Sequence, residues 1–595
     1  MTSQIKISNI NDLWSSLLIE ELLRHGIEYF CISPGSRSGP LAVAVARNKR
    51  AKSFRHYDER GLAFHALGYI SATSKPAVVI STSGTAVANF FPAVIEASKK
   101  KLPLIVLTAD RPPELRKTGA DQTIEQPGIF GEYVRWHYDL PCPDLHIKPE
   151  FVLTTVDQAV FRANGELRGP VHLNCMFREP LSPVSTGEDF SKYLEGLKSW
   201  QQTNRVYTHY VHSQKFVSAN ELKRLAETLN EIKNGLMVIG KLSAQENRAE
   251  QEAVLQLSEK LGWPIFADIT SGLRLGCSHP NVIQSFDQIL LSHKFRSTVK
   301  IDYVLHLGGR MTSQRFYQWI EEKRPKHYVL VLNHPLRNDP WHNVATRFQC
   351  GVQSFCENIL PFLKTKKPAV QILSLRSFSR RIQAALDQFL EKKNLLSEPL
   401  VVRLISQYIP KGSGLFLSNS MPIRDMDMYA ACKGEAVLIG ANRGASGIDG
   451  VMASACGFAV GLDKPVTLLI GDIAFLHDLN SLHMLRRFTK PMVIVVLNND
   501  GGAIFSFLPI AQFPDVFEQY FGTPHGLSFE AAAKLFGLNY SSPKSTTEFI
   551  SHYQKAFQEN KSTVIEVKID RKENHQVHLD LQKKIQTLLN RNRNS

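Results

Sequence analysis

The architecture of this chain is readable from residues 468–502, LLIGDIAFLHDLNSLHMLRRFTKPMVIVVLNNDGG. Two apolar runs in this stretch end on polar residues, the first on Gly471-Asp472 and the second on Asn498-Asn499. The segment between them has the length of a helix. Strands that are apolar throughout and alternate with helices indicate a parallel sheet covered on both faces. The carboxyl ends of both strands then lie at one edge of the sheet, where open parallel sheets bind their ligands.

The same alternation extends along the rest of the chain. It is interrupted near residues 183–215 and again near 364–380, both of which are typical of connectors. We therefore expect three consecutive α/β domains with parallel sheets, at 1–185, 186–370 and 371–595. Besides the two strands above, we expect strands at 27–33, 75–84, 102–110, 169–177, 235–240, 263–269, 303–309, 327–333, 414–420, 436–442 and 562–569.

The composition of the 595 residues is that of a globular protein, with 43% hydrophobic and 21% charged residues. No apolar run approaches the roughly 20 residues of a membrane span, and no secretory signal is visible. Eight cysteines are scattered without metal-ligand spacing, which is typical of reduced cytoplasmic thiols. We expect a cytoplasmic protein that does not bind a membrane.

The formal charge of +15 is the one feature that favours nucleic-acid binding. The lysines and arginines are spread along the chain, however, and the one clear cluster is the tail at 583–595. A nucleic-acid groove concentrates its charge in one stripe with interleaved aromatic residues. We therefore expect no nucleic-acid partner, and a positive balance also suits anionic small molecules.

The polar residues that end the two strands at 468–502 have the chemistry of a magnesium site. The Asp472 carboxylate, the Asn499 side-chain oxygen and a backbone carbonyl at Gly501 are hard oxygen ligands, which suit Mg²⁺ or Mn²⁺ bound together with phosphate oxygens. The helix after Gly471 offers backbone N–H groups to the same phosphates. Neither GxGxxG nor GxxxxGK[ST] follows a strand, so a dinucleotide fold or a P-loop is not indicated.

The spacing of Gly471-Asp472 and Asn498-Asn499 resembles that of thiamine diphosphate enzymes. The resemblance implies a pyrimidine-binding domain at 1–185, a central domain at 186–370 and a diphosphate-binding domain at 371–595. It also implies a catalytic glutamate beside the pyrimidine ring of the cofactor. Glu59, in HYDERGLAFHALG (56–68), matches that glutamate, and its carboxyl would relay a proton on the ring.

Five longer blocks narrow the resemblance. CISPGSRSGPLA (31–42), TADRPPELRKTGADQTIEQ (108–126), MTSQRFYQW (311–319), NRGASGIDG (442–450) and GDIAFLHDLNSL (471–482) resemble the 2-succinyl-5-enolpyruvyl-6-hydroxy-3-cyclohexene-1-carboxylate synthases of menaquinone biosynthesis. Members of this family are C–C bond-forming transferases. They decarboxylate 2-oxoglutarate on thiamine diphosphate and add the resulting succinyl-carbanion equivalent to isochorismate in a 1,4-addition.

The family match implies a set of substrate and cofactor contacts. Guanidinium groups suit dicarboxylate substrates because they bind carboxylates in a bidentate manner. The implied substrate-binding residues are Ser36, Arg37, Arg111, Gln122, Arg315, Ser420, Arg424 and Arg443. The implied cofactor contacts are Glu59, Ile448, Gly471, Asp472, Asn499, Ile504, Phe505 and Leu508, of which Ile448 would bend the cofactor and the last three would form an apolar wall.

Two positions depart from the family pattern, because Asp121 replaces an Asn and Gln314 replaces a Lys. Both changes weaken the positive field near a dianionic substrate, which puts affinity in question and not the type of reaction. Phe475, His477 and Asp478 carry part of the resemblance, but no role follows for them from physical chemistry.

Two other functions remain open at this point. Another thiamine diphosphate lyase, such as an acetohydroxyacid synthase, usually has different pocket residues, and often bound flavin. An inactive scaffold of the same fold would be expected to lose Glu59 or a metal ligand, and neither is lost. In the family, the first domain of one subunit faces the last domain of another. We therefore expect a homodimer or homotetramer with active sites at the subunit interface.

Overall fold

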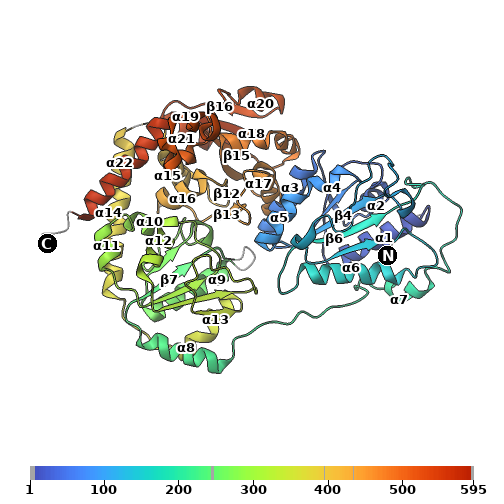
Figure 1. The fold of residues 1–595 in the computed structure, drawn as a ribbon, viewed down its shortest axis with the longest axis horizontal. Helices are drawn as coiled ribbons and strands as arrows, with labels where there is room; N and C mark the ends of the chain where they lie inside the picture. Colours follow the sequence, from blue (N-terminus) through green and yellow to red (C-terminus); the bar gives the residue numbers. More distant parts are fainter. Residues whose placement is uncertain (1–6, 243–246, 394, 433, 560, 591–595) are drawn as a thin grey trace. The chain divides into compact units, whose positions relative to one another are not determined.

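A computed structural model describes residues 7–242, 247–393, 395–432, 434–559 and 561–590, and it contains three wholly parallel sheets (Figure 1). The predicted fold class is therefore confirmed. By its internal contacts the chain forms two compact units. Unit 1 comprises Met1–Ser213, Asn442–Leu462 and Asn480–Met484, and unit 2 comprises the remaining segments. The domain boundaries 1–185, 186–370 and 371–595 stay a prediction.

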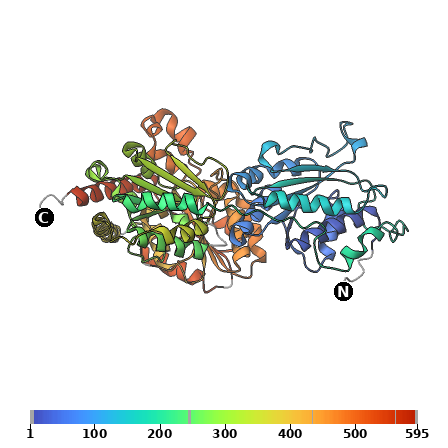
Figure 2. The same cartoon turned by 90° about the horizontal axis from the view of Figure 1, so that it is seen from below.

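The sheet of unit 1 has six strands in the order β2-β1-β3-β4-β6-β5. Helices cover both of its faces (Figure 2). One face carries α1 (Ile10–Arg24), α2 (Gly39–Arg47) and α6 (Glu150–Ala163), and the other carries α3 (Glu59–Thr73), α4 (Thr85–Asn89) and α5 (Phe91–Lys100). The strands are β1 (Tyr29–Ile32), β2 (Lys52–Arg55), β3 (Ala77–Ser81), β4 (Leu104–Asp110), β5 (His137–Leu140) and β6 (Val171–Met176).

A close helix pair completes unit 1. Helix α17 (Val451–Leu462) packs along α3, and glycines allow the two backbones to approach. A Cβ at Gly68 would lie 1.9 Å from the carbonyl oxygen of Ser454, and one at Gly457 would lie 1.8 Å from that of His65. The Ser454 hydroxyl donates to the Phe64 carbonyl at 3.1 Å. Segment 442–462 connects two strands of the third sheet. It is therefore held against α3, the helix that begins at Glu59.

The middle sheet, in unit 2, has the order β11-β10-β9-β7-β8. Its strands are β7 (Gly235–Ile239), β8 (Ile265–Ala267), β9 (Tyr303–Leu307), β10 (His327–Leu332) and β11 (Thr346–Gln349). Helices α8 (Ala219–Glu231), α9 (Asn247–Leu261) and α13 (Val352–Ile359) pack on one face. Helices α10 (Phe286–Ile289), α12 (Gln314–Lys323) and α14 (Val370–Lys393) pack on the other, in a core shared with the third sheet.

The third sheet has the order β13-β12-β14-β15-β17-β16, which is the strand succession of the first sheet. Helices α15 (Glu398–Tyr408), α16 (Met421–Tyr429), α21 (Thr546–Ala556) and α22 (Arg571–Asn590) join its core, and α22 packs beside α14 (Figure 1). Its strands are β12 (Gly414–Leu417), β13 (Leu438–Ala441), β14 (Val466–Gly471), β15 (Met492–Asn498), β16 (Asn539–Ser541) and β17 (Thr563–Lys568).

Shorter elements connect these layers. They are α7 (Lys198–Gln201), α11 (His293–Thr298), α18 (Asp472–His477), α19 (Pro514–Phe517), α20 (Glu530–Leu535) and a 3-10 helix at Leu479–Arg487. In the described part of the chain, no helix has both the length and the apolarity that a membrane crossing requires.

Each predicted strand is present, and the structure adds β2, β5, β11 and β16. All four lie at sheet edges or are largely exposed or half-buried, so their sequences lack a continuous apolar run. The interpretation of 364–380 as a connector is wrong from Val370 onward, because α14 begins there. Of the basic tail at 583–595, residues 583–590 belong to α22 and 591–595 lie outside the described residues.

Candidate active site

The ends of three neighbouring strands in the third sheet place polar residues at one edge. Ser420 follows β12, Asp472 follows β14 and Asn499 follows β15, and these parallel strands are adjacent. Asp472 Oδ2 accepts hydrogen bonds from the backbone N–H groups of Asn499 at 3.1 Å and Gly501 at 3.0 Å. The structure therefore brings the three predicted metal-binding positions together around one carboxylate.

The Asp472 carboxylate is 2% exposed, and this burial raises its pKa. Its backbone hydrogen bonds and His525, whose Nε2 lies 3.3 Å from Oδ2, act in the opposite direction. Among the described residues, Oδ1 accepts a single local bond at 2.7 Å, from the backbone N–H of Ile473. A buried carboxylate held mainly by neutral donors is an unneutralised negative charge that suits a cation.

The two asparagines of the NND turn differ in their surroundings. Asn498 Nδ2 donates to Glu566 Oε1 at 2.6 Å and to the Leu527 carbonyl at 3.0 Å, so this side chain joins the turn to the sheet. Asn499 Nδ2 donates to Glu398 Oε1 at 2.7 Å. The Oδ1 atom of Asn499 is buried and has no hydrogen-bond partner among the described residues. An orphaned carbonyl oxygen beside a buried carboxylate fits a hard divalent cation.

Gly471 and Gly501, at this edge of the sheet, differ in their backbone conformation and in the space around them. Gly501 has φ +131°, and a Cβ there would lie 1.9 Å from the Gly522 carbonyl oxygen, so the fold itself requires glycine. Gly471 has φ −78°, and a Cβ there would meet no described atom within 4 Å. The space above Gly471 is therefore open in the protein.

A buried network behind Asn499 was not predicted from the sequence. Glu398, Asp425 and His578 place ligand-type atoms within 4.8 Å of one another. Burial and the neighbouring Asp425 raise the pKa of Glu398 to about 8. In the sequence, the motif Ser397-Glu398-Pro399 is that of an ordinary helix start, so nothing local distinguishes this glutamate from a capping residue.

Two predicted substrate-binding positions share the first turn of α16. Ser420 has φ +68°, and its carbonyl accepts a hydrogen bond from Arg424 Nη1 at 2.6 Å. Burial lowers the pKa of Arg424. Arg315 is different, because its guanidinium forms an ion pair with Asp287 within the middle sheet's layer. The exposed Gln314 next to it takes no part in that pair.

The predicted apolar wall lies in the segment after Gly501. Ile504 and Phe505 belong to a 3-10 helix at Ala503–Phe507 and are half-buried, and Leu508 is 48% exposed. Phe505 contacts Phe521 edge-on at 5.5 Å. Phe475, which had no assigned role, lies fully buried against Phe529.

In unit 1, two arginines stand at strand ends. Arg37 follows β1, and its Nη1 donates to the Phe177 carbonyl at 2.8 Å. Arg111 directly follows β4. Burial and the positive charge of Arg111 lower the pKa of Arg37. The Nε atoms of both arginines are buried and find no acceptor in the described ranges. Arg37 Nη2 also lies 3.5 Å from Oε1 of the exposed Glu179. Two like charges with unfilled Nε donors still favour an anionic ligand, and Ser36 is exposed in the same loop as Arg37.

Gln122 is exposed, has φ +50°, and lies in the loop after Arg111. Gln126, which was not predicted, holds this loop: its Oε1 accepts from the Gly84 N–H at 3.0 Å, and its Nε2 donates to the Ala109 carbonyl at 3.1 Å. Asp121 is exposed in the same loop. Gln126 was missed because its only sequence signal is a glutamine in a polar loop.

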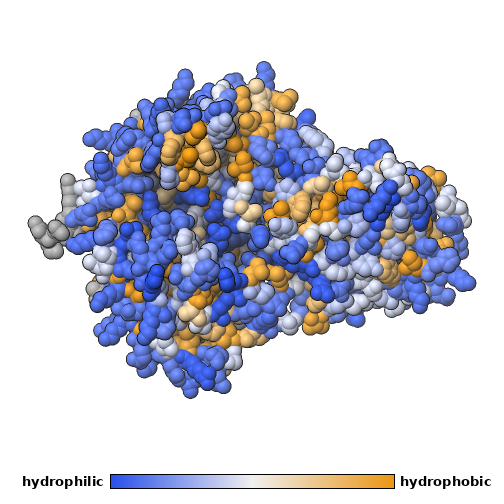
Figure 3. All heavy atoms as spheres, viewed as in Figure 1, coloured by the Kyte–Doolittle hydropathy of each residue, from blue (hydrophilic) through white to orange (hydrophobic). Residues whose placement is uncertain are grey.

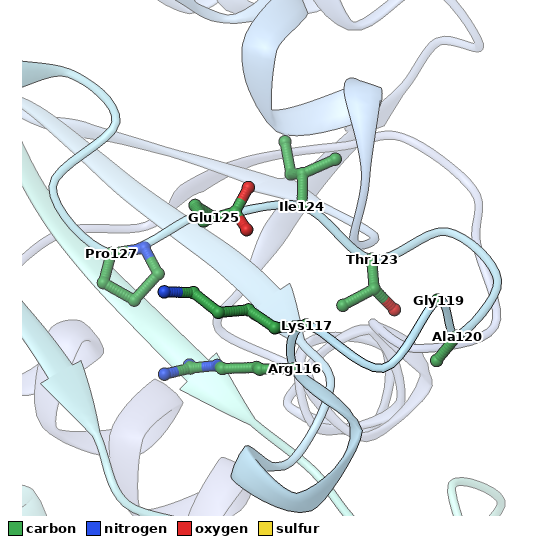
Figure 4. A pocket seen from close by; sticks show the side chains of 8 residues that line it. All are labelled: Arg116, Lys117, Gly119, Ala120, Thr123, Ile124, Glu125 and Pro127. Carbon is green, nitrogen blue, oxygen red and sulfur yellow. The ribbon is translucent and has the colours of Figure 1, made fainter.

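The same loop encloses a cavity of about 280 Å³. Figure 4 shows the side chains of Arg116 and Lys117 running alongside each other into it, with Glu125 on its wall. The guanidinium of Arg116 is already paired, at 2.7 Å with Asp110 and at 2.9 Å with Asp139. The cavity therefore holds little unpaired charge from this arginine.

Glu59 is the first residue of α3 and is half-buried. The preceding Asp58 caps the helix by accepting from the N–H groups of Arg60 at 2.9 Å and Gly61 at 3.3 Å. Asp58 Oδ2 also accepts from Asn480 Nδ2 at 2.6 Å, which ties segment 480–484 to the same helix end.

Arg443 and Ile448 lie in the loop before α17, and Ile448 is 36% exposed. The buried carboxylate of Glu96 holds this loop by accepting from the N–H groups of Gly444 at 2.8 Å and Ala445 at 2.6 Å. The predicted residues thus fall into two sets. Unit 1 contains Ser36, Arg37, Glu59, Arg111, Gln122, Arg443 and Ile448, and unit 2 contains Arg315, Ser420, Arg424, Gly471, Asp472, Asn499, Gly501, Ile504, Phe505 and Leu508.

Comparison with known protein families defines the class. Residues 14–129 match the N-terminal TPP binding domain of thiamine pyrophosphate enzymes, 191–417 match their middle domain, and 430–567 match their C-terminal TPP binding domain. The chain is thus a thiamine diphosphate (thiamine pyrophosphate) enzyme by its domains.

Full-length similarity to individual proteins assigns the chain to one family within this class. The chain is 46% identical to 2-succinyl-5-enolpyruvyl-6-hydroxy-3-cyclohexene-1-carboxylate synthase of Rubrobacter xylanophilus, over 96% of this chain and 98% of the relative. The synthases of Chlorobium phaeobacteroides (44%, covering 98% and 99%) and Salinibacter ruber (43%, covering 97% and 97%) are similar over the same extent. The chain belongs to the 2-succinyl-5-enolpyruvyl-6-hydroxy-3-cyclohexene-1-carboxylate synthase family.

Proposed function

We propose that this protein decarboxylates 2-oxoglutarate and adds the resulting four-carbon unit to isochorismate in menaquinone biosynthesis. The full-length identity with synthases of this name carries the proposal. Bound thiamine diphosphate supplies the electron sink that decarboxylation of a 2-oxoacid requires. The protein's own residues bind the two anionic substrates, hold the cofactor and move a proton.

Asp472, Asn499 and the backbone at Gly501 would hold Mg²⁺ or Mn²⁺ together with the diphosphate. The buried Asp472 carboxylate and the orphaned Asn499 Oδ1 support this assignment. The open space above Gly471 leaves room for a diphosphate to approach the backbone. Ile448, Ile504, Phe505 and Leu508 would supply apolar contacts to the cofactor and the reacting atoms.

Arg37 and Arg111 would clamp a substrate carboxylate, since their mutual repulsion and unfilled Nε donors are both relieved by an anion. Arg424 and Arg443, with Ser36, Gln122 and Ser420, would complete the substrate contacts. Arg315 would have to share its charge with Asp287. Glu59 would hold and release a proton at the pyrimidine ring, because it is an accessible carboxyl at a capped helix end.

We further propose a cytoplasmic homodimer or homotetramer in which Glu59 of one subunit serves the site of Asp472 of another. No disulfide forms among the eight cysteines, all of which lie in the described ranges. Large apolar side chains are exposed along 508–535, including Phe513 at 55% and Leu535 at 76%. Apolar surface is visible over α20 in Figure 3. Surface of this kind favours a subunit contact.

The reaction assay tests the activity directly. The protein is incubated with 2-oxoglutarate, isochorismate, thiamine diphosphate and Mg²⁺, and isochorismate absorbance is followed. We expect a loss of absorbance that requires every component. A pyruvate-dependent carboligation without isochorismate loss would contradict the proposal and favour an acetohydroxyacid synthase-like enzyme, and flavin absorbance in the purified protein would point the same way.

Co-expression of two inactive subunits tests the shared site. Glu59→Gln and Asp472→Ala subunits should each be inactive alone. If each site combines Glu59 and Asp472 from different subunits, random dimers of the two variants should recover about a quarter of the wild-type activity, because half are mixed and each mixed dimer has one intact site. If both residues of a site come from one chain, co-expression should recover none.

A further inference from the structure

The amide of Asn499 has two chemically different ends in two different environments. Its Nδ2 donates to Glu398 Oε1 at 2.7 Å, while Oδ1 is buried without a partner in the described part of the chain. Both residues are nearly inaccessible, at 6% and 1% exposure. The two ends of an asparagine amide have almost the same shape, and only hydrogen bonding distinguishes them. Glu398 therefore determines which end of the amide it faces.

Glu398 is itself held in place from α16 and α22. Its backbone N–H donates to Asn574 Oδ1 at 2.9 Å. The carbonyl of Asn574 accepts from His578 Nδ1 at 2.9 Å, and His578 Nε2 lies 3.1 Å from Asp425 Oδ1. These contacts join the start of α15 to the C-terminal helix, and all the residues involved are buried. The acceptor that Asn499 meets is therefore rigidly placed.

The same cluster has the composition of a second cation site, since Glu398, Asp425 and His578 have the residue types of metal ligands. Both His578 nitrogens are already engaged, and Glu398 Oε1 is taken by Asn499. These engaged atoms connect helices to the metal-binding turn, while Glu398 Oε2 and Asp425 Oδ2 have no hydrogen-bond partner among the described residues. This occupancy favours a positioning network.

We propose that Glu398 is a positioning residue for the divalent cation of this enzyme. By accepting from Asn499 Nδ2 it leaves the amide oxygen free to bind the cation, although Glu398 is not itself a ligand. Outer hydrogen-bond partners commonly orient metal ligands in this way. The inference rests on the proposed cation site at Asp472 and Asn499 and deepens it.

Two replacements of Glu398 distinguish the effect of its hydrogen-bond acceptor from the effect of its side-chain size. Glu398→Met keeps the length of the side chain and removes the acceptor. Glu398→Gln keeps an acceptor for Asn499, and its NH₂ group faces Asp425, whose Oδ2 has no hydrogen-bond partner among the described residues. With thiamine diphosphate present, Mn²⁺ binding is measured by electron paramagnetic resonance. We expect Glu398→Met to weaken binding roughly 10- to 100-fold and Glu398→Gln to leave it near the wild-type value.

The Asn499→Asp variant serves as a second starting protein, in which a positioning role of Glu398 can be distinguished from a purely structural role. In Asn499→Asp both ends of the side chain are oxygens, so no orientation has to be chosen, and the new carboxylate faces Glu398. There, adding Glu398→Met should change Mn²⁺ binding far less than it does in the wild-type background, because Asn499→Asp has no amide left to orient. A purely structural role would weaken binding in both backgrounds and would overturn the proposal, as would unchanged binding in the Glu398→Met single variant.

The Asp472→Ala variant separates this inference from the cation site on which it rests. If Asp472→Ala abolishes Mn²⁺ binding while Glu398→Met leaves it intact, the cation site stands and the positioning role is wrong. If Asp472→Ala leaves binding unchanged, both are wrong. One bound Mn²⁺ per chain is expected, and a second ion lost in Glu398→Met or His578→Gln would show that the cluster is a metal site instead. Thermal melting curves of each variant confirm that the protein tested is folded.

Discussion

The first and third sheets share one strand succession and carry different chemistry at the ends of their central strands. In the first sheet, β4 ends on Asp110, which is fully buried and paired with Arg116 at 2.7 Å and Asn174 Nδ2 at 2.8 Å. In the third sheet, the carboxylate stands one strand over, after β14, and Asp472 meets mainly backbone N–H groups. One acid is neutralised by an arginine. The other has backbone donors and His525 at 3.3 Å, which suits the proposed cation.

This difference shows that topology alone does not locate a metal site. Parallel strands bring their ends to one edge in both sheets, and both edges carry a buried aspartate. What differs is the partner. The Arg116 guanidinium compensates the charge of Asp110, while the neutral backbone donors orient Asp472 without compensating its charge. A buried acid without a guanidinium partner is the better candidate for a cation ligand.

The largest expected effect distinguishes these two aspartates. Asp472→Ala should abolish Mn²⁺ binding in the presence of thiamine diphosphate, a loss beyond the roughly 100-fold that follows from losing a hydrogen-bond partner of a ligand. Asp110→Asn should leave Mn²⁺ binding unchanged and lower the free energy of unfolding by about 1–3 kcal/mol. Mn²⁺ titration and thermal melts of both variants test this. Equal losses of Mn²⁺ binding in the two variants would contradict the assignment of different roles to Asp472 and Asp110.

The glycines of the third sheet's edge give the next largest effect. Gly501→Ala should lower the free energy of unfolding by about 3 kcal/mol or more, because of its positive φ and the contact with the Gly522 carbonyl. Gly471→Ala meets open space, so its stability should stay within about 0.5 kcal/mol of wild type. Its thiamine diphosphate affinity should nevertheless fall, if the cofactor uses that space. A Gly471→Ala variant with unchanged affinity would remove Gly471 from the cofactor site.

The smallest expected effect concerns a histidine beneath the first sheet's edge. Burial lowers the pKa of His172 to about 3, and Thr108 Oγ1 lies 2.7 Å from its Nε2. Its folded-state pKa lies below the unfolded value near 6.5. The stability from the neutral ring is therefore complete above pH 6.5 and is lost as the pH falls toward 3.

His172→Gln should reduce the loss of stability on acidification by about 1.4 kcal/mol per pH unit below pH 6.5. Unfolding free energies at pH 7.0, 6.0 and 5.0 measure this difference. His578→Gln is the matched control in unit 2, because Asp425 raises the pKa of His578 against the effect of burial. If the pH dependence of stability were unchanged in His172→Gln, this histidine would take up its proton in the folded protein at the same pH as in the unfolded chain.

Much of the architecture was predictable because buried parallel strands must be apolar along their whole length. The central strands, such as β14 and β15, carry that pattern plainly. The strands that were not predicted are largely exposed or half-buried, as in Lys52–Arg55 and Thr346–Gln349, so their sequences resemble loops. The start of α14 was missed because Pro-, Lys- and Ser-rich residues precede and enter the helix, and its burial comes from other layers.

The amino-acid sequence alone specified the apolar strands, the polar residues that end them and the family blocks, because these are local patterns along the chain. The partners of those residues depend on segments distant in sequence. Arg315 meets Asp287, Gln126 meets Gly84, and Asn499 meets Glu398, which lies 101 residues away. Charge compensation and amide orientation are pairwise properties of side chains in space. Whether each predicted residue is free to bind a ligand is therefore known only once the chain has folded.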